Sequence, residues 1–114
     1  MPEQGDIVLV PVPFTDLSSQ KRRPVIVVSN NEYNRTTHDM VVVGMTSQPR
    51  SSPYGFTITS ADLDRGALNH PGQVRVDKVY ALAQSLVIKT FGRVNAKVLD
   101  RIRVLLQDLA AVKP

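Results

Sequence analysis

The sequence predicts a single, mainly β domain that ends in one amphipathic helix. Three observations carry this prediction: six or seven short apolar or alternating segments fill most of the chain, turn-forming residues separate them, and the apolar spacing becomes helical only near the C-terminus. The chain has 114 residues, which suits one domain covering 1–114. We therefore expect a strongly curved sheet or a small barrel with a helix packed on it.

The predicted strands are of two kinds. Continuous apolar runs are typical of strands that are covered on both faces, whereas alternating runs are typical of strands with one polar face. The continuous runs are 7–12, 25–28 and 40–45, and the alternating runs are 56–60 and 73–79. Residues 80–88 are expected to add one or two strands, broken near 84–85.

The last alternating strand places three polar side chains on one face. Val74 and Val76 point inward in this alternation. Gln73, Arg75 and Asp77 then share the opposite face. A cation and a carboxylate so placed form a salt bridge or bracket a phosphodiester, and the pattern alone slightly favours the salt bridge.

The C-terminal segment has the spacing of a helix with one apolar face. Apolar residues recur at helical intervals from Val98 to Leu109. Asn95 is the expected N-cap, and Pro114 lies past the expected end. The remaining connections are polar or rich in turn-forming residues, and they are 14–22, 30–38, 49–53 and 61–72.

The densest positive charge stands directly before a predicted buried strand. Lys21 and Arg22 are typical of a solvated loop. Arg23 differs because Pro24 follows it at the junction of loop and strand, and a guanidinium fixed there suits bidentate binding of a phosphate. Lys and Arg total 14 against 10 Asp and Glu, a balance that permits a polyanionic partner.

A second polar group follows the strand expected at 40–45. Thr46 and Ser47 carry hydroxyls and Gln48 carries an amide, all of which can contact phosphates or bases. Serine and threonine are also common turn caps, and taken alone the turn cap is the more frequent role.

The sequence lacks the motifs of several classes of protein and site. There is no cysteine, so we expect neither disulfides nor thiolate metal sites. His38 and His70 match no metal-binding spacing, and we expect no metal and no cofactor. No phosphate-binding glycine loop and no nucleophile elbow is present. Because the chain shows no signal peptide and no apolar run long enough to span a membrane, we expect a soluble, cytoplasmic protein without a membrane partner.

Four stretches resemble the MazF/PemK (Kid) toxin family in the same order, and the likeness extends through the C-terminal helix. They are GDIVLVPVPFTD, RRPVIVVSN, VVVGMTSQ and GALNHPGQVRVDKV. The resemblance implies an SH3-like small barrel of the plasmid-maintenance-toxin type shared by CcdB, MazF and Kid. It also implies a homodimeric, metal-independent and sequence-specific endoribonuclease (an mRNA interferase) that cuts single-stranded RNA to 2′,3′-cyclic phosphate and 5′-hydroxyl ends. A cognate MazE-like antitoxin would neutralise it.

The resemblance also assigns site residues. The Arg of the family's R-P motif and the Thr of its T-S-Q motif act in cleavage, and they match Arg23 and Thr46. In Kid-like members an Arg and an Asp on a later strand are implicated, and they match Arg75 and Asp77. The residues expected to bind RNA are Lys21, Arg22, Ser47, Gln48, Arg50 and Gln73.

The chemistry of these side chains suggests a division of labour. Arginine is effectively always protonated and is therefore a poor general base. We expect Arg23 to bind the phosphate and stabilise its developing charge, and Asp77 to act as the base. Arg75 would hold the phosphate or donate to the leaving group, and Thr46 would hydrogen-bond a phosphate oxygen or the 2′-hydroxyl.

The chain departs from the family pattern in two places, and three alternatives stay open. Residues 18–22 lack the glycine that many members carry before the R-P motif, and 14–23 has no counterpart of the Kid-like catalytic histidine. One alternative is an RNA-binding module or an inactive homologue. A CcdB-like gyrase poison is less favoured, because the C-terminus AAVKP lacks an aromatic residue. The third is a ribonuclease built on His38 and His70.

Overall fold

The computed structural model describes residues 1–13 and 21–114. Within these residues the strands are β1 (Asp6–Val12), β2 (Lys21–Val27), β3 (Asp39–Thr46), β4 (Gly55–Ile58), β5 (Leu63–Gly66), β6 (Gly72–Ala83) and β7 (Lys89–Val94). The helices are α1 (Asn31–Thr36) and α2 (Ala96–Leu109), with short 3-10 turns at Ser60–Asp62 and Gln84–Leu86. None of the described helices is long and apolar enough to cross a membrane.

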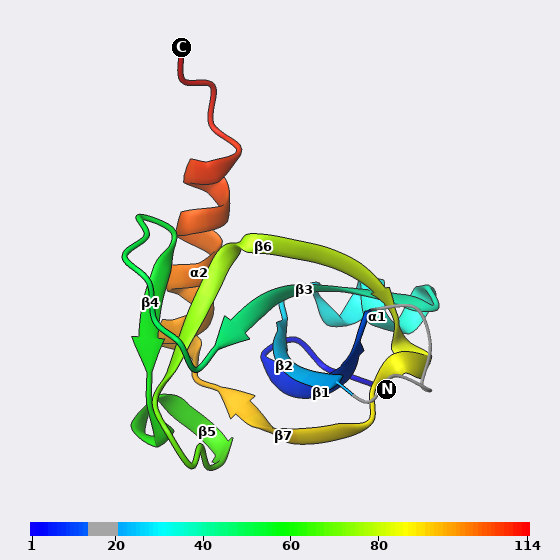
Figure 1. Ribbon diagram of the computed structural model, residues 1–114. Coiled ribbons are helices and arrows are strands. Elements are labelled where there is room, and N and C mark those ends of the chain that lie inside the picture. Colours follow the sequence, from blue (N-terminus) through cyan, green and yellow to red (C-terminus); the bar gives the residue numbers. More distant parts are fainter. Residues whose placement is uncertain (14–20) are drawn as a thin grey trace.

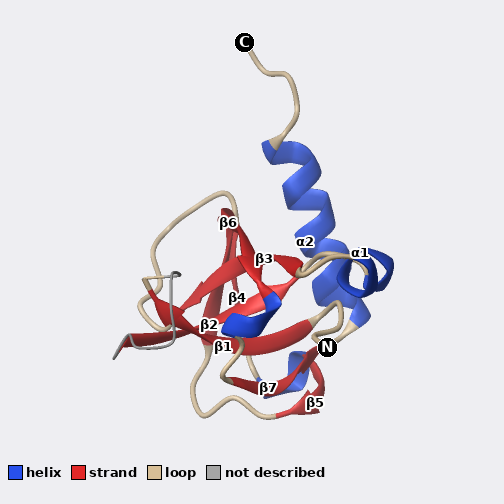
Figure 2. Ribbon diagram, turned by 90° about the vertical axis from the view of Figure 1, so that its right-hand side faces the viewer, coloured by secondary structure: helices blue, strands red, loops and turns tan. Residues whose placement is uncertain are grey.

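The described strands form one antiparallel sheet in the order β4-β6-β3-β2-β1-β7-β5. The sheet curls into a half-barrel, and α2 stands beside β4 and β6 (Figure 1). Figure 2 shows α2 projecting beyond the strands and carrying the C-terminus away from the sheet. The prediction of a mainly β, strongly curved domain with a C-terminal helix is confirmed.

Both faces of the central strands are buried, which explains their continuous apolar runs. The face under α2 carries a cluster that we call the helix-side core, and it includes Ile7, Ile26, Val43, Val74, Val76, Val98 and Ile102. The inside of the curl carries the barrel-side core, formed by Val8, Val10, Val25, Val27, Met40, Val42, Leu82 and Leu86. Neighbouring residues of β2 alternate between the two cores, so a strand with two covered faces needs apolar side chains at every position.

Helix α2 begins where the sequence predicts. The side-chain oxygen of Asn95 accepts the backbone N–H of Val98 at 3.0 Å, so Asn95 is the N-cap. Val98 and Ile102 share one face of the helix and are almost completely buried against the sheet. Burying a side chain of this size contributes about 1.5–3 kcal/mol, and this contact fixes the helix on the sheet.

Strand β2 starts earlier than predicted, and this corrects the placement of the cationic cluster. Lys21, Arg22 and Arg23 lie in β2 itself and pair with the last residues of β1. Their side chains are exposed, so their charges stay in water although the backbone belongs to the sheet. The rest of the loop predicted at 14–22 lies outside the described residues.

Three elements were not predicted from the sequence: α1 and β5, which lie in predicted connections, and β7. Residues 31–36 form α1, whose N-cap Asn30 accepts the N–H of Tyr33 at 2.8 Å. Strands β5 and β7 pair at the end of the sheet, where a Cβ on Gly66 would meet the Phe91 carbonyl oxygen at 2.1 Å. Only glycine allows such a close approach of two backbones, and Gly66 also has φ +79°.

Candidate functional site

A bulge in β6 shapes the site. Val43 of β3 pairs with Val79, but the next residue, Gly44, pairs with Arg75. Residues 76–78 of β6 therefore have no partner on β3. A Cβ on Gly44 would lie 3.2 Å from the Cβ of Lys78, so the glycine leaves room for the bulge. Bulges re-aim side chains and are frequent beside active sites.

The bulge changes which side chains of β6 point the same way. An odd number of extra residues reverses the alternation of a strand. Arg75 and Tyr80, which would face opposite sides of a regular strand, therefore lie on the same face. Arg75, Lys78 and Tyr80 all line one pocket, whereas Asp77 does not line it.

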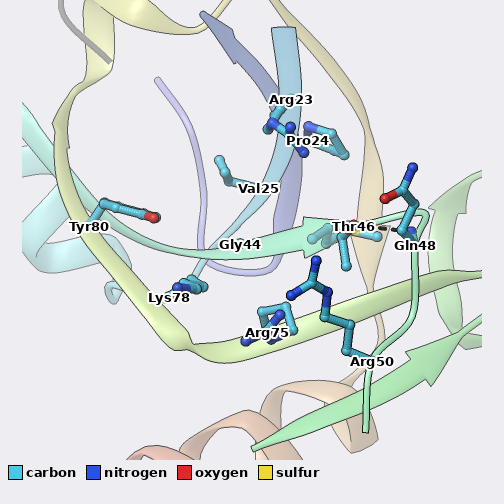
Figure 3. Close-up of a pocket in the computed structure, with 11 residues that line it drawn as sticks. Arg23, Pro24, Val25, Gly44, Thr46, Gln48, Arg50, Arg75, Lys78 and Tyr80 are labelled. Carbon is cyan, nitrogen blue, oxygen red and sulfur yellow. Dashed lines mark hydrogen bonds between the residues drawn. The ribbon is translucent and has the colours of Figure 1, made fainter. Parts of the chain in front are cut away.

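This pocket, which we call the cationic pocket, opens at one end of the barrel-side core. Its lining residues come from β2, β3, β6 and the segment after β3, and they are Arg23, Pro24, Val25, Gly44, Met45, Thr46, Gln48, Arg50, Arg75, Lys78 and Tyr80. Figure 3 shows Arg23 on one side of Thr46, and Arg50 and Arg75 on the other. Four cationic side chains thus line one pocket together with the hydroxyl groups of Thr46 and Tyr80, a set of groups that suits a phosphate.

Arg75 is paired with the neighbouring carboxylate. Its Nε lies 3.3 Å from Oδ1 of Asp77 and its Nη2 lies 3.3 Å from Oδ2. The hydrogen bonds from Arg75 hold the pKa of Asp77 below its ordinary value. The salt bridge that the strand spacing favours is therefore present.

Thr46 ends β3 with its side chain already oriented. Its Oγ1 accepts the backbone N–H of Gln48 at 3.1 Å, as in the turn cap that the sequence favours. Because this bond uses a lone pair, the hydroxyl hydrogen stays available for an acceptor in the pocket. The cap and the binding role are therefore compatible.

Three other predicted residues lie beside the cationic pocket without lining it. Lys21, Arg22 and Ser47 line a shallow adjoining pocket that shares Arg23 and Thr46. The structure thus groups these polar residues around the end of β3 and the start of β2.

Gln73 is not placed as the sequence predicts. We expected an exposed side chain beside Arg75, but Gln73 is only 7% exposed. Its amide is engaged with the backbone of Arg50, accepting from the N–H at 2.9 Å and donating to the carbonyl oxygen at 2.5 Å. The side chain of Gln73 is therefore engaged with the Arg50 backbone, and its predicted contact with RNA stays a prediction.

Sequence reasoning missed Lys78 and Tyr80. Strict alternation assigns both to the face opposite Arg75, and only the bulge returns them to the pocket. The available signal was Gly44, because a glycine inside a strand of β-branched residues often marks a bulge or a close approach.

The two histidines are exposed, and neither lines the cationic pocket. His38 precedes β3, whereas His70 lines a largely apolar pocket that adjoins the cationic pocket and shares Pro24, Met45 and Thr46 with it. Among the described residues no group of three acidic, histidine or cysteine side chains could hold a metal ion.

Comparison with solved structures gives relatives over nearly the whole chain. An endoribonuclease from a mycobacterial species, solved in complex with its cognate antitoxin, is 25% identical with a TM-score of 0.78, and the match covers 100% of each chain. MazF from Deinococcus radiodurans is 25% identical with a TM-score of 0.75, covering 95% of this chain and 94% of that one. A MazE–MazF complex from the same organism has 24% identity and a TM-score of 0.76, covers 98% and 97%, and supports the fold alone. No curated protein matches the chain.

A family model settles the relationship that the four sequence stretches suggest. The model for the PemK-like, MazF-like toxin of type II toxin–antitoxin systems matches residues 3–110. The curled seven-strand sheet with a C-terminal helix is the fold of the MazF structures above, so the predicted fold type is confirmed. The chain belongs to the PemK-like, MazF-like toxins of type II toxin–antitoxin systems.

Proposed function

We propose that this chain is an endoribonuclease toxin that cuts single-stranded RNA in a sequence-specific, metal-independent manner. Its family and the endoribonuclease among its relatives support the enzyme class. One observation locates the proposed site: Arg23, Arg50, Arg75 and Lys78 line one pocket together with Thr46. Side chains of this kind bind a phosphodiester and stabilise the charge that develops on it.

The proposed reaction is a transesterification within the RNA. The 2′-oxygen gives up its proton and bonds to the adjacent phosphorus, and the bond from phosphorus to the 5′-oxygen breaks. The leaving 5′-oxygen takes up a proton. The products are a 2′,3′-cyclic phosphate and a 5′-hydroxyl, and the reaction as written consumes no water and needs no metal.

In this proposal, stabilisation of the charge that develops on the phosphate supplies the larger part of the rate acceleration. The backbone of Arg23 is fixed in β2 by its pairing with Val10, so the side chain extends from a fixed position at the edge of the pocket. Thr46 donates its hydroxyl hydrogen to a phosphate oxygen or contacts the 2′-hydroxyl. A preorganised donor of this kind is typically worth about 10²–10³ in rate.

Proton transfer is assigned to the β6 side of the pocket. Asp77 does not itself line the pocket, but among the described residues it is the carboxylate that pairs with a lining cation, so it accepts the 2′ proton in this proposal. Its lowered pKa keeps it ionised but makes it a weak base, so its contribution is modest. Arg75, Lys78 and Tyr80 are the pocket's candidate donors to the leaving oxygen.

The proposed partners follow from the same surface. The mycobacterial relative is solved with its cognate antitoxin, and we propose that a MazE-like antitoxin likewise neutralises this chain in the cytoplasm. An acidic segment laid across Arg22, Arg23 and the cationic pocket would exclude RNA. We also propose a homodimer, which light scattering on the purified protein tests directly, since a monomer mass would contradict it.

The experiment is cleavage in the presence of excess chelator. Purified protein is incubated with a long unstructured RNA, and the product ends are mapped. Discrete cuts that disappear in Arg23→Ala, with an unchanged circular dichroism spectrum, support the proposal. Binding of several RNAs without any cut would contradict the enzyme and favour an RNA-binding module. Full activity after replacing His38 and His70 with alanine excludes a histidine mechanism.

A further inference from the structure

One connection of the sheet has to cross a strand. Strand β6 lies between β3 and β4, yet residues 47–54 join β3 to β4. The crossing occurs near Gln73, which pairs with Thr46 of β3 on one side and with Thr57 of β4 on the other. Arg50 lies in the crossing segment and lines the cationic pocket.

The side chain of Gln73 fastens this crossing at Arg50. Its Oε1 accepts the Arg50 N–H at 2.9 Å, and its Nε2 donates to the Arg50 carbonyl oxygen at 2.5 Å. Both backbone groups of Arg50 are thereby satisfied by one side chain, as a neighbouring strand would satisfy them. Because Gln73 is only 7% exposed, water competes poorly for these bonds.

Gly55 keeps the space in which this amide lies. A Cβ at Gly55 would meet Nε2 of Gln73 at 2.8 Å, which is too close for an undisturbed contact. The Arg50 side chain is exposed and has no ion-pair partner among the described residues. Its position at the pocket therefore depends on its backbone.

We propose that Gln73 is a positioning residue for RNA binding: it holds the backbone of Arg50 so that the guanidinium is presented at the cationic pocket, and it does not contact RNA itself. This inference rests on the proposed function. It replaces the direct RNA contact expected from the sequence with an effect transmitted through Arg50.

The test is a double-mutant cycle between Gln73 and Arg50. Gln73→Met keeps the side-chain volume and removes both hydrogen bonds. We expect it to raise KM for RNA cleavage by about tenfold, with kcat within about twofold of the wild-type value, because a displaced binding group weakens substrate binding. In an Arg50→Ala background, which leaves the backbone clamp in place, Gln73→Met should have no further effect.

Two further variants separate this role from a general loss of structure. Gln84 donates comparable hydrogen bonds from Nε2 to the carbonyl oxygens of Asn34, Thr37 and Asp39. None of these four residues lines the cationic pocket. Gln84→Met should therefore leave KM unchanged. Gly55→Ala should displace the Gln73 amide and reproduce the KM increase of Gln73→Met.

Amide exchange at Arg50 measures the clamp without any cleavage. Gln73→Met should speed exchange of the Arg50 N–H, and Gln84→Met should not. Unchanged exchange, or a KM effect that persists in the Arg50→Ala background, would overturn the inference. A wild-type protein that cuts no RNA would instead overturn the proposed function, and with it the role in RNA binding.

Discussion

Replacing Lys78 with methionine should reduce the salt dependence of RNA binding without unfolding the protein. Lys78 lies in the β6 bulge, exposed and at the edge of the cationic pocket. Methionine keeps most of the side-chain length and removes the charge. If the ammonium contacts a phosphate of bound RNA, its loss removes one counterion-release event from binding.

The size of the salt dependence follows from the number of unpaired cationic side chains at the site. Arg22, Arg23, Arg50 and Lys78 have no carboxylate partner among the described residues, whereas Arg75 is paired. With about 0.7 counterions released per contact on a single strand, four contacts predict a slope of about −2.8 for log K against log salt. Affinity should then fall roughly 50-fold between about 50 and 200 mM salt. Lys78→Met should bring the slope to about −2.1.

The assay is fluorescence anisotropy with a single-stranded RNA that carries 2′-O-methyl groups throughout, because such an RNA lacks the attacking hydroxyl. Lys97→Met is the matched control, since Lys97 is an exposed lysine in the first turn of α2, on the opposite face of the sheet. An unchanged slope in Lys78→Met, or an equal reduction in Lys97→Met, would refute the assignment of Lys78 to the RNA site.

Two further predictions concern proton transfer and the core. Asp77→Asn should slow cleavage by about 10²-fold or less, and by less than Arg23→Ala does. Because Arg75 lowers the pKa of Asp77, titration of this carboxylate should leave the wild-type rate unchanged until the pH falls below the ordinary aspartate range; a rate controlled by a group titrating near pH 6–7 would assign the base elsewhere. Ile102→Ala should destabilise the protein by about 2–5 kcal/mol in urea unfolding, because Ile102 is fully buried under α2, and a loss below about 1 kcal/mol would contradict that packing.

The parts of the fold that depend on local pattern were predictable from the sequence. The apolar run of β2 indicates a strand with two covered faces, and Val25 and Ile26 do belong to different cores. The helical spacing and the N-cap Asn95 locate α2, because both signals lie within a few residues of each other.

The parts that depend on non-local pairing were not predictable in the same way. Lys21 belongs to a strand because Val12 of β1 pairs with it, although its charge is typical of a loop. Strands β5 and β7 exist because two backbones meet at Gly66 and Gly92, which are far apart in sequence. Pairing of this kind leaves little trace in a single short segment.

In the candidate site, too, the residues carried by local motifs were predictable, and those placed by non-local pairing were not. Arg23 and Thr46 stand out because motifs at strand ends carry them, and the structure brings both to one pocket. Lys78 escaped notice because a bulge breaks the alternation on which the prediction relied. The alternation of β6 places Gln73 on an outward face. It is nevertheless buried, because the segment that joins β3 to β4 crosses β6 near it, and a single sequence does not reveal that crossing.

The central claim is that the RNA's own 2′-hydroxyl attacks the phosphate held in the cationic pocket. The most direct measurement uses one RNA with a mapped cleavage site, made once with ribose throughout and once with a single 2′-deoxy residue on the 5′ side of the scissile phosphate. The account predicts that the deoxy substitution abolishes cutting at that site in chelator, while cuts at other sites persist. Continued cutting at the substituted position would contradict it, because the nucleophile would then have to come from elsewhere.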